Sequence, residues 1–312
     1  NLPNPDINLN VRSGSHAQTT AAILKSLDGA IDAVGPDTVL VYGDTDTTLA
    51  AALTAAKKGI HLAHLEAGLR SFNRSMPEEV NRVLTDHAAD LLLAPTPLAM
   101  ENLAKENLVD RAVLTGDVMV DICVRAAGSI RENPPNFELP PDRFVLATLH
   151  RPSNTDNAVR LHSIITALSN LPVPVLLPVH PRLANALASF GLSLEERGVL
   201  GTPPFGYQLL MYALQSAVAV VTDSGGLQKE ARVLQVPCTT IRSETEWPES
   251  LEGGWNILHP DPESPNVGEV VLRERPTEPT GWPFGRGDAA CRVAAALVGF
   301  EANKPSPQLA VP

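Results

Sequence analysis

The chain has 312 residues, of which 44% are hydrophobic, so it is long enough for two domains with sizeable cores. Asp and Glu number 35 against 24 Lys and Arg, a net charge of −11. This balance argues against a general nucleic-acid binder or a protein of anionic membranes, because both need a basic surface. The negative net charge does not exclude binding of a small anionic ligand, because a single pocket can be locally positive.

Three cysteines, Cys123, Cys238 and Cys291, are an odd number at wide spacings. We expect free thiols in a reducing compartment, and therefore a cytoplasmic protein. The sequence has no apolar run of membrane-spanning length and no signal-peptide pattern.

The first half alternates short apolar runs with longer amphipathic stretches. After a helix at 17–34, strands are expected at 38–44, 60–65 and 91–96, with helices between them and at 97–107 and 118–131. This βαβα alternation is typical of parallel strands covered by helices. No strand is evident before Val39, so we expect that an amino-terminal portion of this domain is missing from the sequence.

A proline-rich segment, 132–143, is the best linker candidate, and the same alternation resumes after it. The predicted fold is α/β, with two doubly wound, Rossmann-like domains. We place the first at 1–138 and the second at 139–290. A helix at 291–302 is expected to pack back towards the first domain, and 303–312 to be a disordered tail.

Polar residues follow the predicted strands again and again. Ligands of open α/β sheets bind beyond the carboxyl ends of the strands, so such residues are site candidates. They are Asp44, Glu66, His150, His180, Ser224 and Arg242.

The segment TDSGGLQKEA, 222–231, contains the clearest ligand motif. Gly225 and Gly226 allow close approach of the backbone, and the N–H groups at the start of the following helix favour a phosphate. Glu230, on that helix, is within reach of an attached ribose. The alternative is that Ser224 simply caps the helix.

The acidic residues also have structural alternatives. Asp44 is a candidate helix cap. Glu66 follows an apolar strand, where its pKa would rise, but a salt bridge to Arg70 or Arg82 would also explain it. Glu78 and its neighbour Glu79 suit the positive end of a helix dipole. For His64 we favour a packed strand histidine.

Several site classes have no motif here. The histidine spacings do not fit a metal site, and there is no nucleophile elbow, dinucleotide fingerprint or P-loop. These absences argue against a metal site, a hydrolase triad and a nicotinamide, and they leave both a phosphate site and a simple helix cap possible at Ser224.

Eight blocks, in the same order, resemble the non-hydrolysing UDP-N-acetylglucosamine 2-epimerases. They are YGDTDTT, HLEAGLRS, MPEEVNR, LHRPSNTDN, PVHPR, TDSGGLQKEA, RSETEWPE and PFGRGDAACR, and the resemblance runs from about residue 10 to 298. It implies a GT-B-like fold of two Rossmann-like domains with the active site between them, and a homodimer. UDP-GlcNAc would be converted to UDP-ManNAc without an added cofactor, and UDP-GlcNAc as an activator is left open.

Carried over position by position, the resemblance assigns catalysis and UDP binding to separate groups of residues. Two departures stand out: the family's first strand and its basic turn are absent, and Pro152-Ser153 replaces a common Arg-Glu or Ala-Glu. The catalytic candidates are Asp44, Glu66, Glu78 and His150. The UDP-binding candidates are His180, Ser224, Gly225, Gly226, Glu230 and Arg242.

The resemblance implies that UDP leaves carbon 1 as carbon 2 loses its proton, giving a glycal that takes UDP back after reprotonation on the other face. This route would need acid/base groups of the protein near both faces of the sugar ring, and cationic groups that stabilise the leaving diphosphate. Alternatives remain: a related UDP-diacetamido-uronic acid as substrate, a hydrolysing epimerase, a GT-B glycosyltransferase, and a non-catalytic UDP-sugar sensor.

Overall fold

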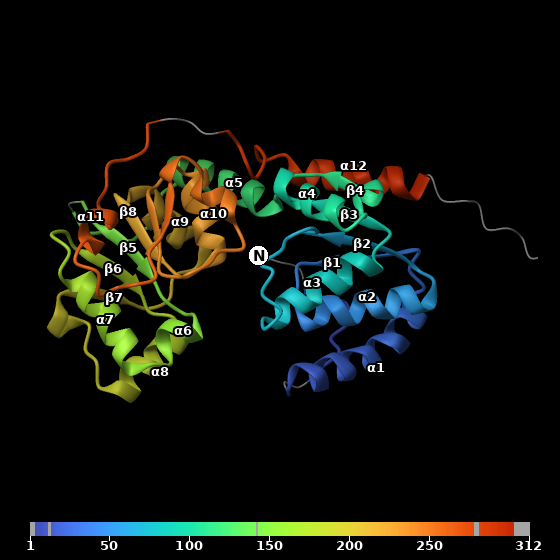
Figure 1. The fold of residues 1–312 in the computed structure, drawn as a ribbon, viewed down its shortest axis with the longest axis horizontal. Coiled ribbons are helices and arrows are strands. Elements are labelled where there is room, and N and C mark those ends of the chain that lie inside the picture. Colours follow the sequence, from blue (N-terminus) through green and yellow to red (C-terminus); the bar gives the residue numbers. More distant parts are fainter. Residues whose placement is uncertain (1–3, 12–13, 142, 278–280, 303–312) are drawn as a thin grey trace, which may run out of the picture. The chain divides into compact units, whose positions relative to one another are not determined.

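The computed structural model describes residues 4–11, 14–141, 143–277 and 281–302. The chain forms two compact units (Figure 1). The first unit comprises the residues up to Val118 and those from Phe284 onward, and the second unit is Met119–Pro283. The segment 303–312, expected to be a disordered tail, lies outside the described residues.

The division falls between Val118 and Met119, at the start of helix α5 (Val118–Glu132), whereas the sequence analysis placed it at 138/139, within the proline-rich segment. Cys123 and Ile130 of α5 are buried in the core of the second unit, beside Phe144 and Leu146. The helix therefore belongs almost entirely to the second unit, because its apolar face packs there.

Among its described residues, the first unit contains one sheet of four parallel strands in the order β1-β2-β3-β4. β3 is buried along its whole length, as expected for a parallel strand covered on both faces. The strands are β1 (Thr38–Tyr42), β2 (His61–Leu65), β3 (Leu91–Ala94) and β4 (Ala112–Leu114); the helices are α1 (His16–Val34), α2 (Asp46–Lys58), α3 (Pro77–Ala88), α4 (Pro97–Lys105) and α12 (Ala289–Ala302).

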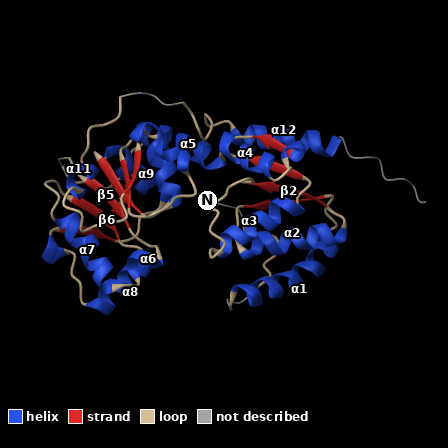
Figure 2. Cartoon of the chain, viewed as in Figure 1, coloured by secondary structure: helices blue, strands red, loops and turns tan. Residues whose placement is uncertain are grey.

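Successive residues of β2 face opposite sides of this sheet. Ala63 and Leu65 pack under α12, where Val293 is the buried contact. His64 points to the other face and meets α3. Figure 2 shows α12 on one side of the sheet and α2 and α3 on the other. The carboxyl-terminal helix thus covers the face that the amino-terminal helices leave open.

In the described part of the second unit, the sheet has six parallel strands in the order β10-β9-β8-β5-β6-β7. The chain starts in the middle at β5, moves outward to β7, returns to β8 and continues the other way. This is the Rossmann strand order, with its switch point between β5 and β8. The strands are β5 (Val145–Thr148), β6 (Val175–Pro178), β7 (Val199–Thr202), β8 (Ala219–Thr222), β9 (Cys238–Thr240) and β10 (Asn256–Leu258).

Helices cover both faces of the second sheet, so this unit is doubly wound as predicted. One core forms under α7, α8 and α11, and the other under α5, α9 and α10. The helices are α6 (Pro152–Thr155), α7 (Ala158–Ser169), α8 (Pro181–Phe190), α9 (Tyr207–Ser216), α10 (Gly225–Val233) and α11 (Val267–Val271); short 3₁₀ turns span Val109–Arg111, Glu195–Arg197 and Pro248–Gly254.

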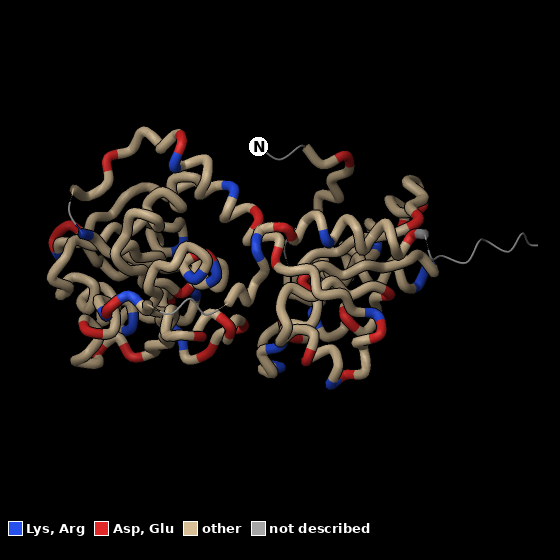
Figure 3. Tube along the Cα trace, turned by 90° about the horizontal axis from the view of Figure 1, so that it is seen from above, with Lys and Arg blue, Asp and Glu red and all other residues tan. Residues whose placement is uncertain are grey.

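Charged residues of both signs are interspersed along each unit (Figure 3). All three cysteines are free, with Cys123 and Cys238 buried and Cys291 exposed. Within the part of the chain that the structure describes, no helix is long and apolar enough to cross a membrane.

Candidate functional site

The switch point of the second sheet brings together polar groups from β5 and β8. The hydroxyls of Thr148 and Thr222, the last residues of these paired strands, lie 2.6 Å apart. His150 follows the first strand and Ser224 the second. Parallel strands that diverge at a switch point leave a crevice beyond their carboxyl ends, where ligands of such sheets bind.

A hollow of about 400 Å³ lies at these strand ends and is lined entirely by the second unit. We call it the switch-point hollow. Four of the six predicted UDP-binding residues line it, together with His150, the catalytic candidate of this unit. The lining residues among them are His150, His180, Ser224, Gly226 and Glu230, joined by Phe205 and Tyr207.

The start of α10 combines a cap with an open backbone. Ser224 is the N-cap, since its Oγ accepts a hydrogen bond from the N–H of Leu227 at 3.4 Å. Gly225 has no spare room, because a Cβ there would lie 2.6 Å from Oε1 of Glu246. Gly226 is open: a Cβ would meet only the Ser224 Oγ, at 3.9 Å. A phosphate can approach the helix start from this side.

Glu230 contributes a buried carboxylate to the switch-point hollow and is only 6% exposed. Burial raises the pKa of the neighbouring Tyr207, and the negative charge of Glu230 raises it further. The phenol therefore stays protonated. A carboxylate in this position suits the hydroxyl groups of a ribose, to which it can accept charge-assisted hydrogen bonds.

Asp223 holds His150 in a fixed orientation, although the sequence analysis overlooked it. Its fully buried carboxylate lies 3.0 Å from Nδ1 of His150 and accepts the backbone N–H groups of His150 and Arg151. Burial alone would raise the pKa of Asp223, but the hydrogen bonds from His150, Arg151 and Asn154 bring it below its ordinary value. Nδ1 thus carries a proton towards Asp223, which leaves Nε2 as the ring's second polar atom.

His180 begins the neighbouring helix, α8. Its Nδ1 accepts the backbone N–H of Arg182 at 3.2 Å, so it caps this helix. Its ring centroid lies 5.6 Å from that of His150. The two imidazoles form adjacent parts of the wall of the switch-point hollow.

Arg242 is set apart from the other candidates. Its guanidinium pairs with Glu246 at 2.8 Å, and it is not among the residues that line the switch-point hollow. Burial alone would raise the pKa of Glu246, but Arg242 and Arg151 lower it. This ion pair lies behind Gly225, whose Cβ position faces Glu246.

In the first unit, Asp44 follows β1 and is held by α3. The cap of α2 is Thr45, so the cap alternative for Asp44 is wrong. Arg82 instead donates to Oδ2 of Asp44 from Nε at 3.1 Å and from Nη2 at 2.5 Å. Asn81 donates to the Asp44 carbonyl at 3.0 Å. The carboxylate remains 28% exposed, and one oxygen has an arginine partner.

Glu66 follows β2, the strand next to β1, with an uncommon left-handed backbone (φ +76°). Its Oε2 lies 3.3 Å from the position a Cβ would take on Gly43, so the carboxylate reaches the residue before Asp44. A non-glycine residue in this conformation carries strain, and such strain is concentrated at functional sites. Asp44 and Glu66 are therefore neighbours at one sheet edge.

Glu78 and Glu79 begin α3 but differ in their surroundings. The Glu79 carboxylate is buried and accepts hydrogen bonds from Ser71, Phe72 and Arg82. Glu78 is half-buried, and among the described residues its side chain has no hydrogen bond or ion pair. Glu79 thus anchors the preceding loop, whereas Glu78 keeps its carboxylate available.

The two arginines proposed as partners of Glu66 have other acidic neighbours. Arg70 pairs with Asp86 and Glu106, and Arg82 with Asp44 and Glu79. His64 is fully buried, as its structural alternative required, and lies against Asp86. The sequence signal for Asp86 was weak, because an acid in a helix is normally read as solvated.

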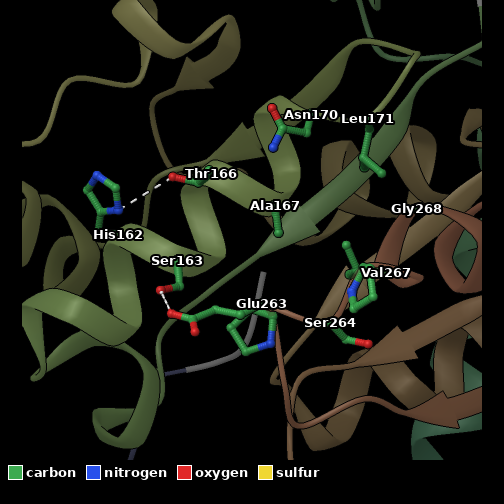
Figure 4. Close-up of a pocket in the computed structure, with 12 residues that line it drawn as sticks. His162, Ser163, Thr166, Ala167, Asn170, Leu171, Glu263, Ser264, Val267 and Gly268 are labelled. Carbon is green, nitrogen blue, oxygen red and sulfur yellow. Dashed lines mark hydrogen bonds between the residues drawn. The ribbon is translucent and has the colours of Figure 1, made fainter.

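A larger hollow, of about 490 Å³, lies between α7 and the segment before α11 (Figure 4). Its polar side chains pair with each other: Ser163 donates to Glu263 at 2.6 Å, and Thr166 lies 3.5 Å from His162. The described residues that line it include none of the sequence candidates. Within the described ranges, no three His, Cys, Asp or Glu side chains are grouped as metal ligands.

Comparisons with known proteins agree with this arrangement. A family model described as UDP-N-acetylglucosamine 2-epimerase matches residues 1–298. A UDP-2,3-diacetamido-2,3-dideoxy-D-glucuronate 2-epimerase of Pseudomonas aeruginosa is 42% identical over 311 residues, covering 95% of this chain and 84% of the relative. A UDP-N-acetylglucosamine 2-epimerase of Methanocaldococcus jannaschii is 37% identical over 314 residues, covering 95% and 85%.

Solved structures give the same result. The Methanocaldococcus jannaschii UDP-GlcNAc 2-epimerase in complex with UDP-GlcNAc and UDP matches with a TM-score of 0.84 at 36% identity, covering 96% of this chain and 85% of that one. The Neisseria meningitidis enzyme bound to UDP-GlcNAc matches at 0.80 and 27%, covering 95% and 86%. The two parallel α/β sheets are those of a GT-B-like fold, and the chain belongs to the UDP-N-acetylglucosamine 2-epimerase family.

Proposed function

We propose that this protein is a non-hydrolysing 2-epimerase that interconverts UDP-GlcNAc and UDP-ManNAc. The observation that carries the proposal is the switch-point hollow, where His150, the Ser224 turn and Glu230 line one space at the strand ends. This combination suits a nucleoside diphosphate, with its phosphates at the helix start and its ribose at the carboxylate.

Both backbone N–H groups and side chains would bind the diphosphate of the nucleotide. The open side of Gly226 lets the β-phosphate approach the N–H groups of α10. His150, oriented by Asp223, would donate from Nε2 to the departing diphosphate when its ring carries a proton on both nitrogens. Arg242 stays a proposed UDP-binding residue, although its guanidinium pairs with Glu246 and does not line the hollow.

The proposed reaction is an elimination followed by re-addition. The bond from carbon 1 to the UDP oxygen breaks, carbon 2 loses its proton, and a double bond forms between the two carbons. UDP then adds back while carbon 2 gains a proton on the opposite face. Asp44, Glu66 and Glu78 are the proposed proton-transfer groups, because they are carboxylates from three neighbouring segments of the first unit.

A second substrate is supported by one specific observation. The relative that is 42% identical is named for UDP-2,3-diacetamido-2,3-dideoxy-D-glucuronate. The chemistry at carbons 1 and 2 would be the same for this sugar, so the same carboxylates would act. The choice between the two sugars depends on groups that contact carbons 3 and 6.

Incubation with each UDP-sugar alone in heavy water tests the proposal. A non-hydrolysing epimerase yields the 2-epimer with deuterium at carbon 2, because the new proton comes from solvent. Release of free sugar and UDP would indicate the hydrolysing reaction. No change in either sugar would contradict epimerase function and favour a transferase or a sensor. The faster of the two sugars identifies the substrate.

We also propose a homodimer and keep UDP-GlcNAc as a candidate activator. Sedimentation equilibrium should give a mass about twice the 33.2 kDa of one chain. If UDP-GlcNAc is an activator, adding a small amount of it should raise the initial rate of UDP-ManNAc conversion above the sum of the rates measured with each sugar alone. A monomer mass, or strictly additive rates, would remove the corresponding proposal.

A further inference from the structure

His64 lies fully buried in the first unit between two hydrogen-bond acceptors. Its Nδ1 is 2.6 Å from Oδ1 of Asp86, on α3. Its Nε2 is 2.8 Å from the carbonyl oxygen of Gly43, in the turn after β1. A carbonyl oxygen can only accept, so Nε2 must carry a proton.

The other ring nitrogen must carry a proton as well if Asp86 is ionised. Arg70 donates to Oδ2 of Asp86 at 2.7 Å, and the backbone N–H of Gly68 donates to the same oxygen at 3.0 Å. Burial alone would raise the pKa of Asp86, but hydrogen bonds from His64 and Arg70 bring it below its ordinary value. Asp86 already accepts from Arg70 and Gly68 on one oxygen, so a proton on Nδ1 would satisfy its other oxygen, and the ring would then be an imidazolium with both protons engaged.

The surrounding charges make a buried imidazolium acceptable. Arg70 also binds Glu106 through two hydrogen bonds, of 2.7 and 2.8 Å. The cluster therefore holds two positive groups, His64 and Arg70, and two negative ones, Asp86 and Glu106. Buried charges persist in proteins when they are paired and hydrogen-bonded in this way.

Gly43, whose carbonyl His64 contacts, adjoins both proposed acids. Asp44 is the next residue along the chain, and Glu66 is two residues beyond His64 itself. The Gly43 N–H donates to the Leu65 carbonyl at 3.1 Å, and the Cβ position of Gly43 lies 3.3 Å from Oε2 of Glu66. Movement of this one peptide would change the separation of both carboxylates.

We propose that His64 is a positioning residue, a buried imidazolium that holds the Gly43 carbonyl and thereby fixes Asp44 and Glu66 relative to each other. Asp86 keeps it charged and oriented. The part of the proposal that concerns catalysis rests on the proposed function of Asp44 and Glu66. The proposed protonation of the His64 ring is independent of that function.

Two amide substitutions separate positioning from a merely structural role. Gln places its amide nitrogen near the Nε2 position and can still donate to Gly43, whereas Asn places it near Nδ1 and can donate only to Asp86. We expect His64→Gln to keep turnover within about tenfold of the native enzyme. We expect His64→Asn to lose at least ~10²-fold in kcat, the effect of misplaced reacting groups, with UDP affinity unchanged.

Equal losses of kcat in the two variants would overturn the positioning role, since both disturb the buried cluster to a similar degree. A thermal midpoint measured for each shows that the comparison is between folded proteins. If the native protein epimerises no UDP-sugar, the proposed function fails first, and the variants are then judged by the protonation measurement alone.

The protonation is measured on the native protein by ¹⁵N NMR with labelled histidine. The signals of His64 are identified by their absence from the His64→Gln spectrum. Both ring nitrogens should resonate as protonated nitrogens, each with an attached hydrogen. A single protonated nitrogen on His64 would overturn the proposal whatever the kinetics show.

Discussion

Asp223 carries a buried charge in the second unit. Its folded pKa is depressed, so its ionisation adds stability above the ordinary value of 3.8. That contribution is lost as the pH falls through the lower folded pKa. We expect Asp223→Asn to be less stable than the native protein at about pH 7, with the difference shrinking below about pH 4.

Urea unfolding of both proteins across this pH range measures the effect. Asp110→Asn is the matched control, because Asp110 is exposed and lies on a 3₁₀ turn of the first unit. A stability difference for Asp223→Asn that does not change with pH would mean that the geometry of the side chain, and not its charge, is what the fold uses.

Glu230 tests the ribose site. Replacing its buried carboxylate with an amide removes charge-assisted hydrogen bonds to the ribose hydroxyls, so Glu230→Gln should weaken UDP binding by roughly 1–3 kcal/mol. Calorimetry with UDP measures this. Glu196→Gln, an exposed glutamate of the same unit, should bind UDP like the native protein. Unchanged affinity in Glu230→Gln would move the ribose elsewhere.

The adjacent glycines of the Ser224 turn should respond differently to the same added methyl. In Gly225→Ala the new Cβ meets Glu246, so we expect a loss of roughly 1–3 kcal/mol of stability. In Gly226→Ala it points into open space, so the fold should keep its stability while UDP binds about tenfold or more weakly. Thermal unfolding and calorimetry on the pair test this, and native-like UDP affinity in Gly226→Ala would remove the phosphate from this turn.

At the scale of elements, α3 buries charge where most surface helices bury apolar side chains. Glu79, Arg82 and Asp86 are spaced by three and four residues, so they share one helix face. That face meets the turns after β1 and β2. The helix therefore acts as a support for the proposed acids.

The sequence predicted some of this and missed the rest for identifiable reasons. Apolar runs marked the strands on both sides of the switch point, so His150 and Ser224 were found from strand ends alone. The partners of Arg70 and Arg82 were not predictable, because each had several acids in reach and tertiary packing made the choice. The boundary within α5 was hidden because a proline-rich loop looks like a linker whether or not the preceding helix packs beyond it.

Helix α12 offers a test at the same scale. Val293 is buried against the sheet of the first unit, whereas Val298 on the same helix is 70% exposed. Val293→Asp should destabilise the protein by at least roughly 2 kcal/mol, because it buries an unpaired charge. Val298→Asp should have almost no effect. Urea unfolding compares the two, and similar midpoints would mean that α12 is not needed to cover the sheet.

For the whole molecule, the proposed division of labour predicts two patterns of hydrogen exchange. UDP alone should slow amide exchange at the start of α10 and after β5, where the nucleotide is proposed to bind. The turns after β1 and β2 should be slowed only by the complete UDP-sugar, because their acids are proposed to face the sugar. Slowing of these turns by UDP alone would contradict this division.

The left-handed backbone of Glu66 predicts which residues would be enriched at position 66 under two kinds of selection. Glycine or asparagine would adopt that conformation with less strain, by about 1 kcal/mol or more. A library screened only for abundance should therefore enrich Gly and Asn at position 66, while one screened for epimerisation should keep Glu. Opposite preferences in the two screens would identify Glu66 as a position where the protein gives up stability for its chemistry.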